Sequence, residues 1–252
     1  MATALVTGAS TGLGAEFARQ LAAAGNDLVL VARSKDRLEG LAAQLLADHG
    51  AEVEVLVADL ATEPGMAKVV ARLADSTRPV DLLVNNAGHG SGAPFLQNDI
   101  EREVAGVELM VRAVMVLAHA AAQGMLARGN GAILNVASVA AWMGYGTYAA
   151  HKAWVTSFTE GLAGELRGTG VTATVVLPGL THTEFHERAN LDSFDGMSEV
   201  VWLKAENVVK SALKATRKGR VLVTPSLRYA VVANITRVLP RTWVRGFTRG
   251  QR

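Results

Sequence analysis

The chain has no cysteine and few aromatic residues, and both absences narrow what it can be. Without cysteine, disulfide bonds and thiolate zinc sites are excluded. Aromatic residues make up only 5% of the 252 residues, whereas half of all residues are hydrophobic. Small and aliphatic side chains must therefore form most of a sizeable core, which suits helices packed closely on a sheet.

Signals for membrane insertion or export are also missing. We find no window with the length and apolarity of a membrane-spanning helix. The N-terminus has neither the charged start nor the cleavage site of a signal peptide. The sequence therefore predicts a cytoplasmic location.

Acidic residues are absent from the C-terminal part of the chain. From Arg220 to the end there are arginines but no aspartate or glutamate: Arg220, Arg228, Arg237, Arg241, Arg245, Arg249 and Arg252. Because the net charge of the whole chain is only +2, the preceding body is slightly acidic. A basic tail on an acidic body does not indicate nucleic-acid binding, and we expect no nucleic-acid partner.

Short apolar runs alternate with longer amphipathic stretches along the chain. The runs that we predict as strands are 4–6, 28–31, 53–57, 80–84, 132–136, 172–176 and 221–223, and the predicted helices are 13–24, 35–48, 63–75, 107–127, 147–166 and 205–216. This alternation predicts an α/β fold, a single Rossmann-like doubly wound parallel sheet of about seven strands with helices on both faces. We expect one catalytic domain over residues 1–223 and a basic amphipathic extension, not an independent domain, over 224–252.

A glycine-rich segment follows the first predicted strand. It reads Thr7-Gly8-Ala9-Ser10-Thr11-Gly12-Leu13-Gly14 and leads into a helix. Such a turn lets backbone amides approach a pyrophosphate at the helix N-terminus, and Gly14 lets the helix pack closely on the strand. A glycine motif alone recurs by chance, but this one lies between the first strand and the first helix, as a dinucleotide site requires.

The residues at the end of the second predicted strand indicate whether the cofactor is NAD or NADP. Enzymes that bind NAD usually place an acid there to hold the ribose 2′-hydroxyl. This chain has Arg33, with Ser34 beside it and Arg37 one turn on. Cations in that place suit the additional phosphate of NADP, so we predict NADP(H) as the cofactor. Asp59 closes the third strand, where its carboxylate can accept a bond from adenine or cap the next helix. We expect Leu60 beside it to contact the cofactor as well.

Tyr148 and Lys152 are four residues apart on a predicted helix and therefore share one face. Two unit charges about 4 Å apart interact by ~4 kcal/mol at an effective dielectric of 20, equivalent to roughly three pK units. We therefore expect Lys152 to bring the pKa of the Tyr148 phenol toward neutrality. Ser138, after the fifth strand, can hydrogen-bond a substrate carbonyl, and Tyr145 competes with Tyr148 for the acid/base role.

As a set, these motifs resemble the short-chain dehydrogenase/reductase family. The resemblance rests on Thr7 to Gly14, on Asn-Asn-Ala-Gly at residues 85–88, on Ser138 with Tyr148-x-x-x-Lys152, and on Pro178-Gly179. It implies that Tyr148 is the acid/base, that Lys152 also holds the nicotinamide ribose and that Ser138 orients the carbonyl. It also implies cofactor contacts for Asn86, Ala87, Gly88, Pro178, Gly179, Leu180, Thr181 and Thr183, and assembly into a homodimer or homotetramer.

The chain departs from the family's usual pattern near the lysine. Members commonly have an asparagine that holds a water there, and this chain has Met110. A backbone carbonyl can substitute, or the proton relay is weaker. We expect an oxidoreductase that transfers hydride between NADP(H) and an apolar carbonyl or alcohol (a ketone, an aldehyde, a 3-oxoacyl or a steroid-like compound). The alternative is a catalytically weak NADP(H)-binding regulatory protein.

The histidines and the tail carry secondary predictions. His182 and His186 have metal-ligand spacing but no third ligand nearby, so we expect no metal site. We expect His89 in a solvated loop, His119 in the core or an interface, and His151 facing outward or a partner subunit. In the tail, Leu227, Val231, Ile235 and Leu239 form an apolar face among arginines, which fits peripheral membrane contact or packing on the body or another subunit.

Overall fold

The structure is a computed structural model that describes residues 2–90, 93–143, 146–182 and 201–238. It contains a parallel sheet of seven strands in the order β3-β2-β1-β4-β5-β6-β7. The strands are β1 (Thr3–Thr7), β2 (Asp27–Ala32), β3 (Val53–Val57), β4 (Leu82–Asn85), β5 (Gly131–Val136), β6 (Val171–Val176) and β7 (Leu222–Val223). The predicted fold class is confirmed, and the strand boundaries differ from the predicted ones by at most two residues.

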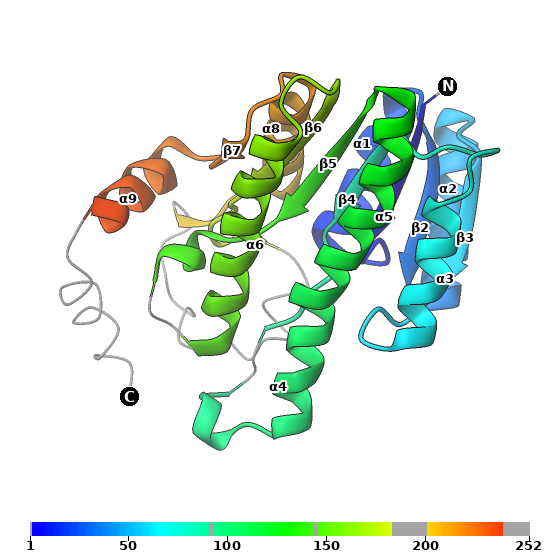
Figure 1. Cartoon of the computed structure of the whole chain (residues 1–252). Coiled ribbons are helices and arrows are strands. Elements are labelled where there is room, and N and C mark those ends of the chain that lie inside the picture. Colours follow the sequence, from blue (N-terminus) through cyan, green and yellow to red (C-terminus); the bar gives the residue numbers. More distant parts are fainter. Residues whose placement is uncertain (1, 91–92, 144–145, 183–200, 239–252) are drawn as a thin grey trace.

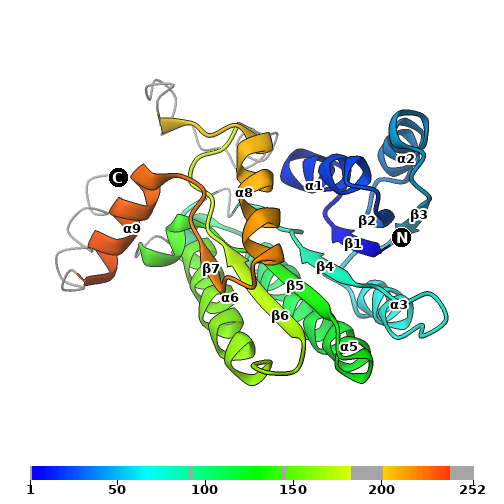
Figure 2. The same cartoon turned by 90° about the horizontal axis from the view of Figure 1, so that it is seen from above.

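Helices cover both faces of the sheet (Figures 1 and 2). One face carries α1 (Gly12–Ala23), α2 (Lys35–His49) and α8 (Ala205–Arg217). The other carries α3 (Glu63–Leu73), α5 (Ala113–Arg128) and α6 (Gly146–Glu165). The last described helix, α9 (Leu227–Val238), lies beyond β7 at the edge of the sheet.

The predicted helix 107–127 is longer and less regular than expected. An additional helix, α4 (Ile100–Val107), precedes it, and a π-helical turn, η2 (Glu108–Arg112), joins α4 to α5. The start of α4 is marked by Asp99, whose side chain accepts a bond from the Glu101 amide. The many charges between residues 99 and 108 conceal this helix from a search for apolar runs.

The continuous helix Ile100–Arg128 also corrects the sequence-based statement about membrane segments. By length and composition alone it is apolar enough to span a membrane, with a mean hydropathy of 1.7 in its most apolar window. In this fold α5 packs against α3, β4 and β5. Its residues Leu117 and Met125 are among the largest fully buried side chains, so part of the apolarity of the helix serves the core.

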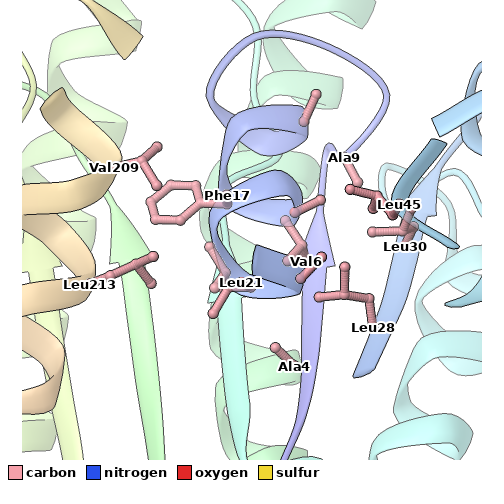
Figure 3. Close-up of a cluster of buried hydrophobic side chains, with 14 of the residues drawn as sticks. Ala4, Val6, Ala9, Phe17, Leu21, Leu28, Leu30, Leu45, Val209 and Leu213 are labelled. Carbon is pink, nitrogen blue, oxygen red and sulfur yellow. The ribbon is translucent and has the colours of Figure 1, made fainter. Parts of the chain in front are cut away.

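The core is divided between the two faces of the sheet. Figure 3 shows the cluster on the α1 side, where Phe17 and Leu21 of α1 meet Val209 and Leu213 of α8. Phe17 is fully buried, and its replacement by alanine would cost about 3–5 kcal/mol in a site of this kind. This packing holds α1, and with it the glycine-rich loop, against the end of β1.

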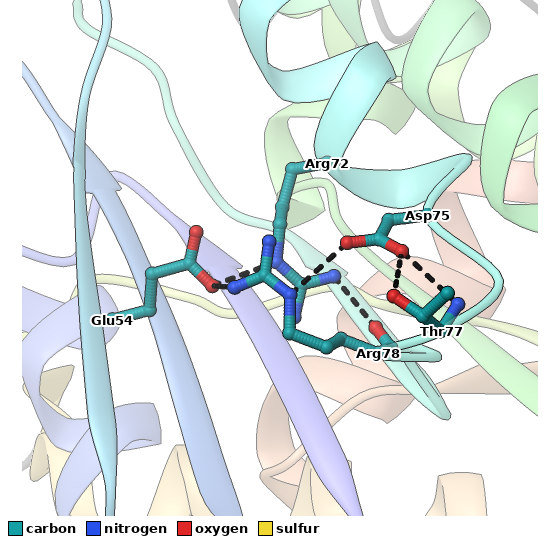
Figure 4. A network of polar contacts seen from close by, with 5 residues as sticks. All are labelled: Glu54, Arg72, Asp75, Thr77 and Arg78. Carbon is teal, nitrogen blue, oxygen red and sulfur yellow. Dashed lines mark hydrogen bonds and ion pairs between the residues drawn. The ribbon is translucent and has the colours of Figure 1, made fainter.

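A polar network stabilises the edge of the sheet that β3 forms (Figure 4). Arg72 of α3 donates a 2.7 Å bond from Nε to Glu54 of β3, and Arg78 reaches the same carboxylate at 3.2 Å. Hydrogen bonds from Thr77 and Arg78 lower the pKa of Asp75 to about 2. These contacts join β3 to the end of α3, far from the carboxyl ends of β4 and β5, so we assign them a structural role.

The sheet order reverses between β1 and β4, which are hydrogen-bonded neighbours although β2 and β3 lie between them in the sequence. In an open parallel sheet, ligands bind beside the carboxyl ends of the strands at such a point. The glycine-rich loop follows β1 and the Asn-Asn-Ala-Gly turn follows β4. The topology therefore brings both predicted motifs to one place.

Candidate active site

The glycine-rich loop is folded tightly against the turn after β4. Gly8 has a left-handed φ of 65°, and a Cβ there would lie 2.9 Å from both Ala87 Cα and Asn86 Nδ2. A Cβ on Gly14 would lie 2.0 Å from the Gly8 carbonyl oxygen. Only glycine permits this close approach, which places the N-terminus of α1 directly behind the loop.

The N-terminus of α1 leaves its amides available. Thr11 is the N-cap residue, but its side chain makes no capping hydrogen bond. The first amides of a helix have no partner within the helix, so an uncapped N-terminus is suited to an anion such as a pyrophosphate. The residues of this loop therefore fit the phosphate groups of a dinucleotide.

The Asn-Asn-Ala-Gly turn connects the strands around this loop. Asn86 donates from Nδ2 to the Thr7 carbonyl at 2.9 Å, and its backbone amide donates to the Thr7 hydroxyl at 2.9 Å. Asn85 donates to Asn135 of β5 at 2.9 Å, and Asn135 donates to Thr159 of α6 at 2.9 Å. This buried chain of hydrogen bonds runs from the switch point to the helix that carries Tyr148 and Lys152.

The residues predicted to read the adenosine end lie at the ends of β2 and β3. Arg33 and Arg37 are exposed, and Ser34 is the N-cap of α2 without a side-chain cap bond. Asp59 accepts a 3.0 Å bond from the Ala61 amide, while Thr62 takes the N-cap position of α3. Leu60 is 95% buried in the core, so only its backbone can face a ligand.

The structure brings Ser138, Tyr148 and Lys152 together. Ser138 is the N-cap of the turn η3 (Val139–Trp142) after β5, and its side chain hydrogen-bonds that of Tyr148. The Lys152 Nζ lies 5.7 Å from the centre of the Tyr148 ring. It donates a 2.9 Å hydrogen bond to the Val136 carbonyl. The hydroxyl groups of Ser138 and Tyr148, which can both hydrogen-bond a carbonyl oxygen, thus lie near the buried ammonium of Lys152.

The pKa values in this site differ from the sequence-based expectation. Burial raises the pKa of Tyr148 to about 12, although the hydrogen bond with Ser138 acts in the opposite direction. Burial also lowers the pKa of Lys152 to about 8. The expected shift of the phenol toward neutrality is therefore not present, because the loss of hydration on burial outweighs the hydrogen bond with Ser138.

Met110 lies next to Lys152, as the alignment with the family predicts. It is 2% exposed and occupies the middle of the π-helical turn η2. Around the position of a Cβ on Gly88, Met110 Sδ lies at 3.4 Å and Lys152 Nζ at 3.6 Å. A thioether holds a water poorly compared with an amide, and Val136 supplies the carbonyl that Lys152 uses.

The prediction for His151 is wrong, because its side chain is 92% buried and does not face outward. It lines a cavity of about 10 Å³ together with Glu103, His89 and Tyr148. Its Nδ1 is buried without a hydrogen-bond partner among the described residues. Burial lowers the pKa of His151, and the nearby Glu103 carboxylate opposes this. Its position in the sequence between Tyr148 and Lys152, on the same helix, could have indicated that it lies near the site.

The predictions for three other histidines have mixed outcomes. His89 is partly buried, and its Nδ1 lies 2.9 Å from the Gly90 carbonyl oxygen. His119 is exposed on α5, so it does not belong to the core of this chain. His182 stacks on Trp202 with the ring centres 4.6 Å apart.

The loop after β6 contains the residues predicted to flank the nicotinamide. Pro178 accepts a 3.0 Å bond from the Val139 amide, which connects this loop to the turn that begins at Ser138. Thr181 is buried and its hydroxyl donates to the Gly179 carbonyl at 2.9 Å. Thr183, Tyr145, His186 and Leu239 lie outside the described residues.

Tyr229 of α9 is a residue that the sequence analysis missed. Its hydroxyl accepts a bond from the Leu180 amide at 3.3 Å and donates one to the Val201 carbonyl at 2.9 Å. Burial raises the pKa of this phenol, so it keeps its proton. No motif marked this tyrosine, because its partners are backbone groups far away in the sequence.

Comparison with known proteins places this site in a family. A family model for short chain dehydrogenases matches residues 2–193. The chain belongs to the short-chain dehydrogenase family. It is therefore an oxidoreductase that acts on carbonyl or alcohol groups, and the predicted family resemblance is confirmed.

Individual relatives are similar over most of their length. A 3-oxoacyl-[acyl-carrier-protein] reductase from Synechocystis is 34% identical over 193 residues, which cover 75% of this chain and 78% of the relative. The structure resembles a short-chain dehydrogenase from Sphingobium yanoikuyae in complex with NADPH, with a TM-score of 0.86, 35% identity and 94% coverage of both chains.

Two further structures widen the comparison. A bulky-bulky ketone specific alcohol dehydrogenase from Comamonas testosteroni has a TM-score of 0.83 at 30% identity, covering 100% of this chain and 95% of that one. A short-chain dehydrogenase/reductase from Burkholderia phymatum in complex with NAD has a TM-score of 0.81 at 25% identity, covering 92% of each chain.

Proposed function

We propose that this chain is an NADP(H)-dependent oxidoreductase that reduces an apolar ketone or aldehyde, or catalyses the reverse oxidation. The observation that carries the proposal is the convergence of Ser138, Tyr148 and Lys152 beside the loop after β6. The N-terminus of α1, without a side-chain cap, is suited to the phosphates of the cofactor. When bound, NADPH supplies the hydride for the carbonyl carbon.

The residues of the chain supply the other half of the reaction. Burial keeps Tyr148 protonated at neutral pH, so its hydroxyl can give the proton that a carbonyl oxygen needs after hydride arrives. Ser138 lies in hydrogen-bond contact with Tyr148 and can bind the same oxygen. We infer that Lys152 holds the nicotinamide ribose and stabilises the phenolate that forms.

The preference for NADP(H) rests on Arg33 and Arg37. Both are exposed at the end of β2, beside the uncapped N-terminus of α2 at Ser34. A guanidinium and a helix N-terminus suit a 2′-phosphate. The NADPH complex of the Sphingobium relative supports this choice, whereas the NAD complex of the Burkholderia relative shows that the fold also binds NAD.

The apolar substrate is proposed from the surroundings of the site. Met110 and the turn η3 (Val139–Trp142) place apolar side chains near Tyr148. The relative that is named for bulky ketones is consistent with this class. Phe185, Phe194 and Met197, between β6 and α8, lie outside the described part of the chain.

The test is a panel of carbonyl compounds with purified protein and NADPH, followed by absorbance at the wavelength of the reduced nicotinamide. We expect turnover with one or more bulky ketones or aldehydes. If NADPH binds but no compound of any class is reduced, the result favours the alternative function, a regulatory protein that only binds NADP(H). Met110 is the feature of the site that fits this alternative.

We also propose that the chain forms a homo-oligomer. Exposed apolar side chains occupy α4 and α5 (Ile100, Val104, Val107, Met115 and Leu126). A hollow of about 310 Å³ lies on α6 beside the stacked rings of Trp154 and Phe158. Light scattering on purified protein would give a dimer or a tetramer, and a monomer at micromolar concentration would contradict the proposal.

Peripheral membrane contact through the tail is a separate proposal. On α9, Leu227, Val231 and Ile235 are 82%, 50% and 50% exposed. Successive residues four apart lie on one face, and each of these three side chains is at least half exposed. An apolar helix face in an arginine-rich segment suits an anionic membrane interface, and another subunit is the competing occupant.

A further inference from the structure

The hydroxyl group of Tyr229 connects two segments that lie on either side of residues 183–200. It accepts from the Leu180 amide, in the loop after β6, and donates to the Val201 carbonyl, shortly before α8. A phenol has one donor, and here that donor and one acceptor site are both used. The contact therefore depends on the hydroxyl and not only on an apolar ring.

The ring of Tyr229 is seated on Gly179. A Cβ built on Gly179 would lie 2.3 Å from the ring atoms Cε2 and Cζ. Real Cβ atoms do not come this close to ring carbons, so the ring and any side chain at residue 179 exclude one another. Gly179 thus has a steric role toward α9 in addition to its place in the loop.

The two segments are also joined to each other by backbone contacts. Leu203 donates to the Leu180 carbonyl at 2.8 Å, and His182 donates to the Leu203 carbonyl at 3.1 Å. Thr181 and Leu203 form a parallel bridge. Tyr229 adds hydrogen bonds at Leu180 and Val201. Through them α9 holds the loop after β6 and the segment before α8 in a fixed relative position.

We propose that Tyr229 is a positioning residue for the nicotinamide end of the dinucleotide. The inference deepens the proposed function and rests on it, since the loop at residues 178–181 is the part that we expect to flank the nicotinamide. Tyr229 does not touch reacting atoms and acts through the backbone of Gly179 and Leu180. A loop held in place before binding loses less freedom when the cofactor arrives, which increases affinity.

The first test is Tyr229→Phe, which keeps the ring and removes both hydrogen bonds. We expect the dissociation constant for NADPH, measured by fluorescence titration, to rise at least about threefold. The KM of the carbonyl should rise as well, while kcat at saturation stays within about twofold. Leu227→Ala on the exposed side of the same helix is the matched control and should change neither value.

The second test is a double-mutant cycle between residues 179 and 229. Gly179→Ala should weaken NADPH binding at least about tenfold in the native background and less than about threefold in a Tyr229→Ala background, where no ring is displaced. Equal weakening in both backgrounds, or native NADPH affinity in Tyr229→Phe, would overturn the inference and leave the proposed function intact. If the native protein binds neither NADPH nor NADH, the proposed function fails and this inference fails with it.

Discussion

Lys152 donates its hydrogen bond to the Val136 carbonyl at 2.9 Å, and its Nζ remains 5.7 Å from the centre of the Tyr148 ring. The ammonium is therefore oriented by the end of β5. Burial lowers its pKa to about 8, well below the ordinary value of 10.5. As the pH rises, Lys152 thus loses its proton well before Tyr148, whose pKa is about 12.

The pH dependence of the reaction follows from this order. We expect kcat/KM for carbonyl reduction to decline as the pH rises through about 8, where Lys152 loses its proton, because Tyr148 with a pKa of about 12 stays protonated there. A pH–rate profile between pH 6 and 10 measures this. The His151→Asn variant should show the same decline. A native profile that stays flat up to pH 10 would contradict the role that we assign to the Lys152 charge.

Cofactor choice depends on Arg33. We expect the native protein to prefer NADPH over NADH by at least about tenfold in kcat/KM, equivalent to ~1.4 kcal/mol. Arg33→Asp should shrink or invert this ratio. The control is Lys35→Ala, since that exposed cation lies 3.6 Å from Glu39 one turn along α2. Equal use of both cofactors by the native protein would count against Arg33.

Met110 tests whether an amide near Lys152 improves proton transfer. If the Val136 carbonyl alone leaves the relay impaired, Met110→Asn should raise kcat on a good substrate, and Met115→Asn on the exposed side of α5 should not. A rate that is unchanged or lower, in a variant with native circular dichroism, would mean that another group already performs this task.

The tail can be tested without disturbing Tyr229. The double variant Leu227→Ser/Ile235→Ser changes only exposed side chains of α9. Full-length protein should sediment with anionic vesicles, less at high salt, and the double variant should remain in the supernatant. If the native protein never sediments and the double variant changes its oligomeric state, the apolar face is a subunit contact and the membrane proposal is wrong.

The features that were predictable from the sequence are those that depend on local patterns. Apolar runs such as 53–57 become buried parallel strands, and the glycines at residues 8 and 14 permit close backbone approach whatever surrounds them. Tyr148 and Lys152 share a helix face because four residues complete about one turn.

The features that escaped prediction depend on long-range packing. The burial of His151 follows from α4, which approaches so closely that a Cβ on Gly106 would lie 3.3 Å from the His151 ring. The pKa of Tyr148 reflects dehydration in the folded chain, which spacing along a helix cannot reveal. Tyr229 meets Leu180 and Val201 across 49 and 28 residues of sequence.

The most direct test of the account is the Tyr148→Phe variant. It removes only the hydroxyl that we propose as the proton donor, so carbonyl reduction should fall by at least about a hundredfold. The dissociation constant for NADPH should stay within about twofold of the native value, because the ring and Lys152 remain. A variant that keeps most of its rate would contradict the assignment of Tyr148 as the acid and with it the proposed mechanism.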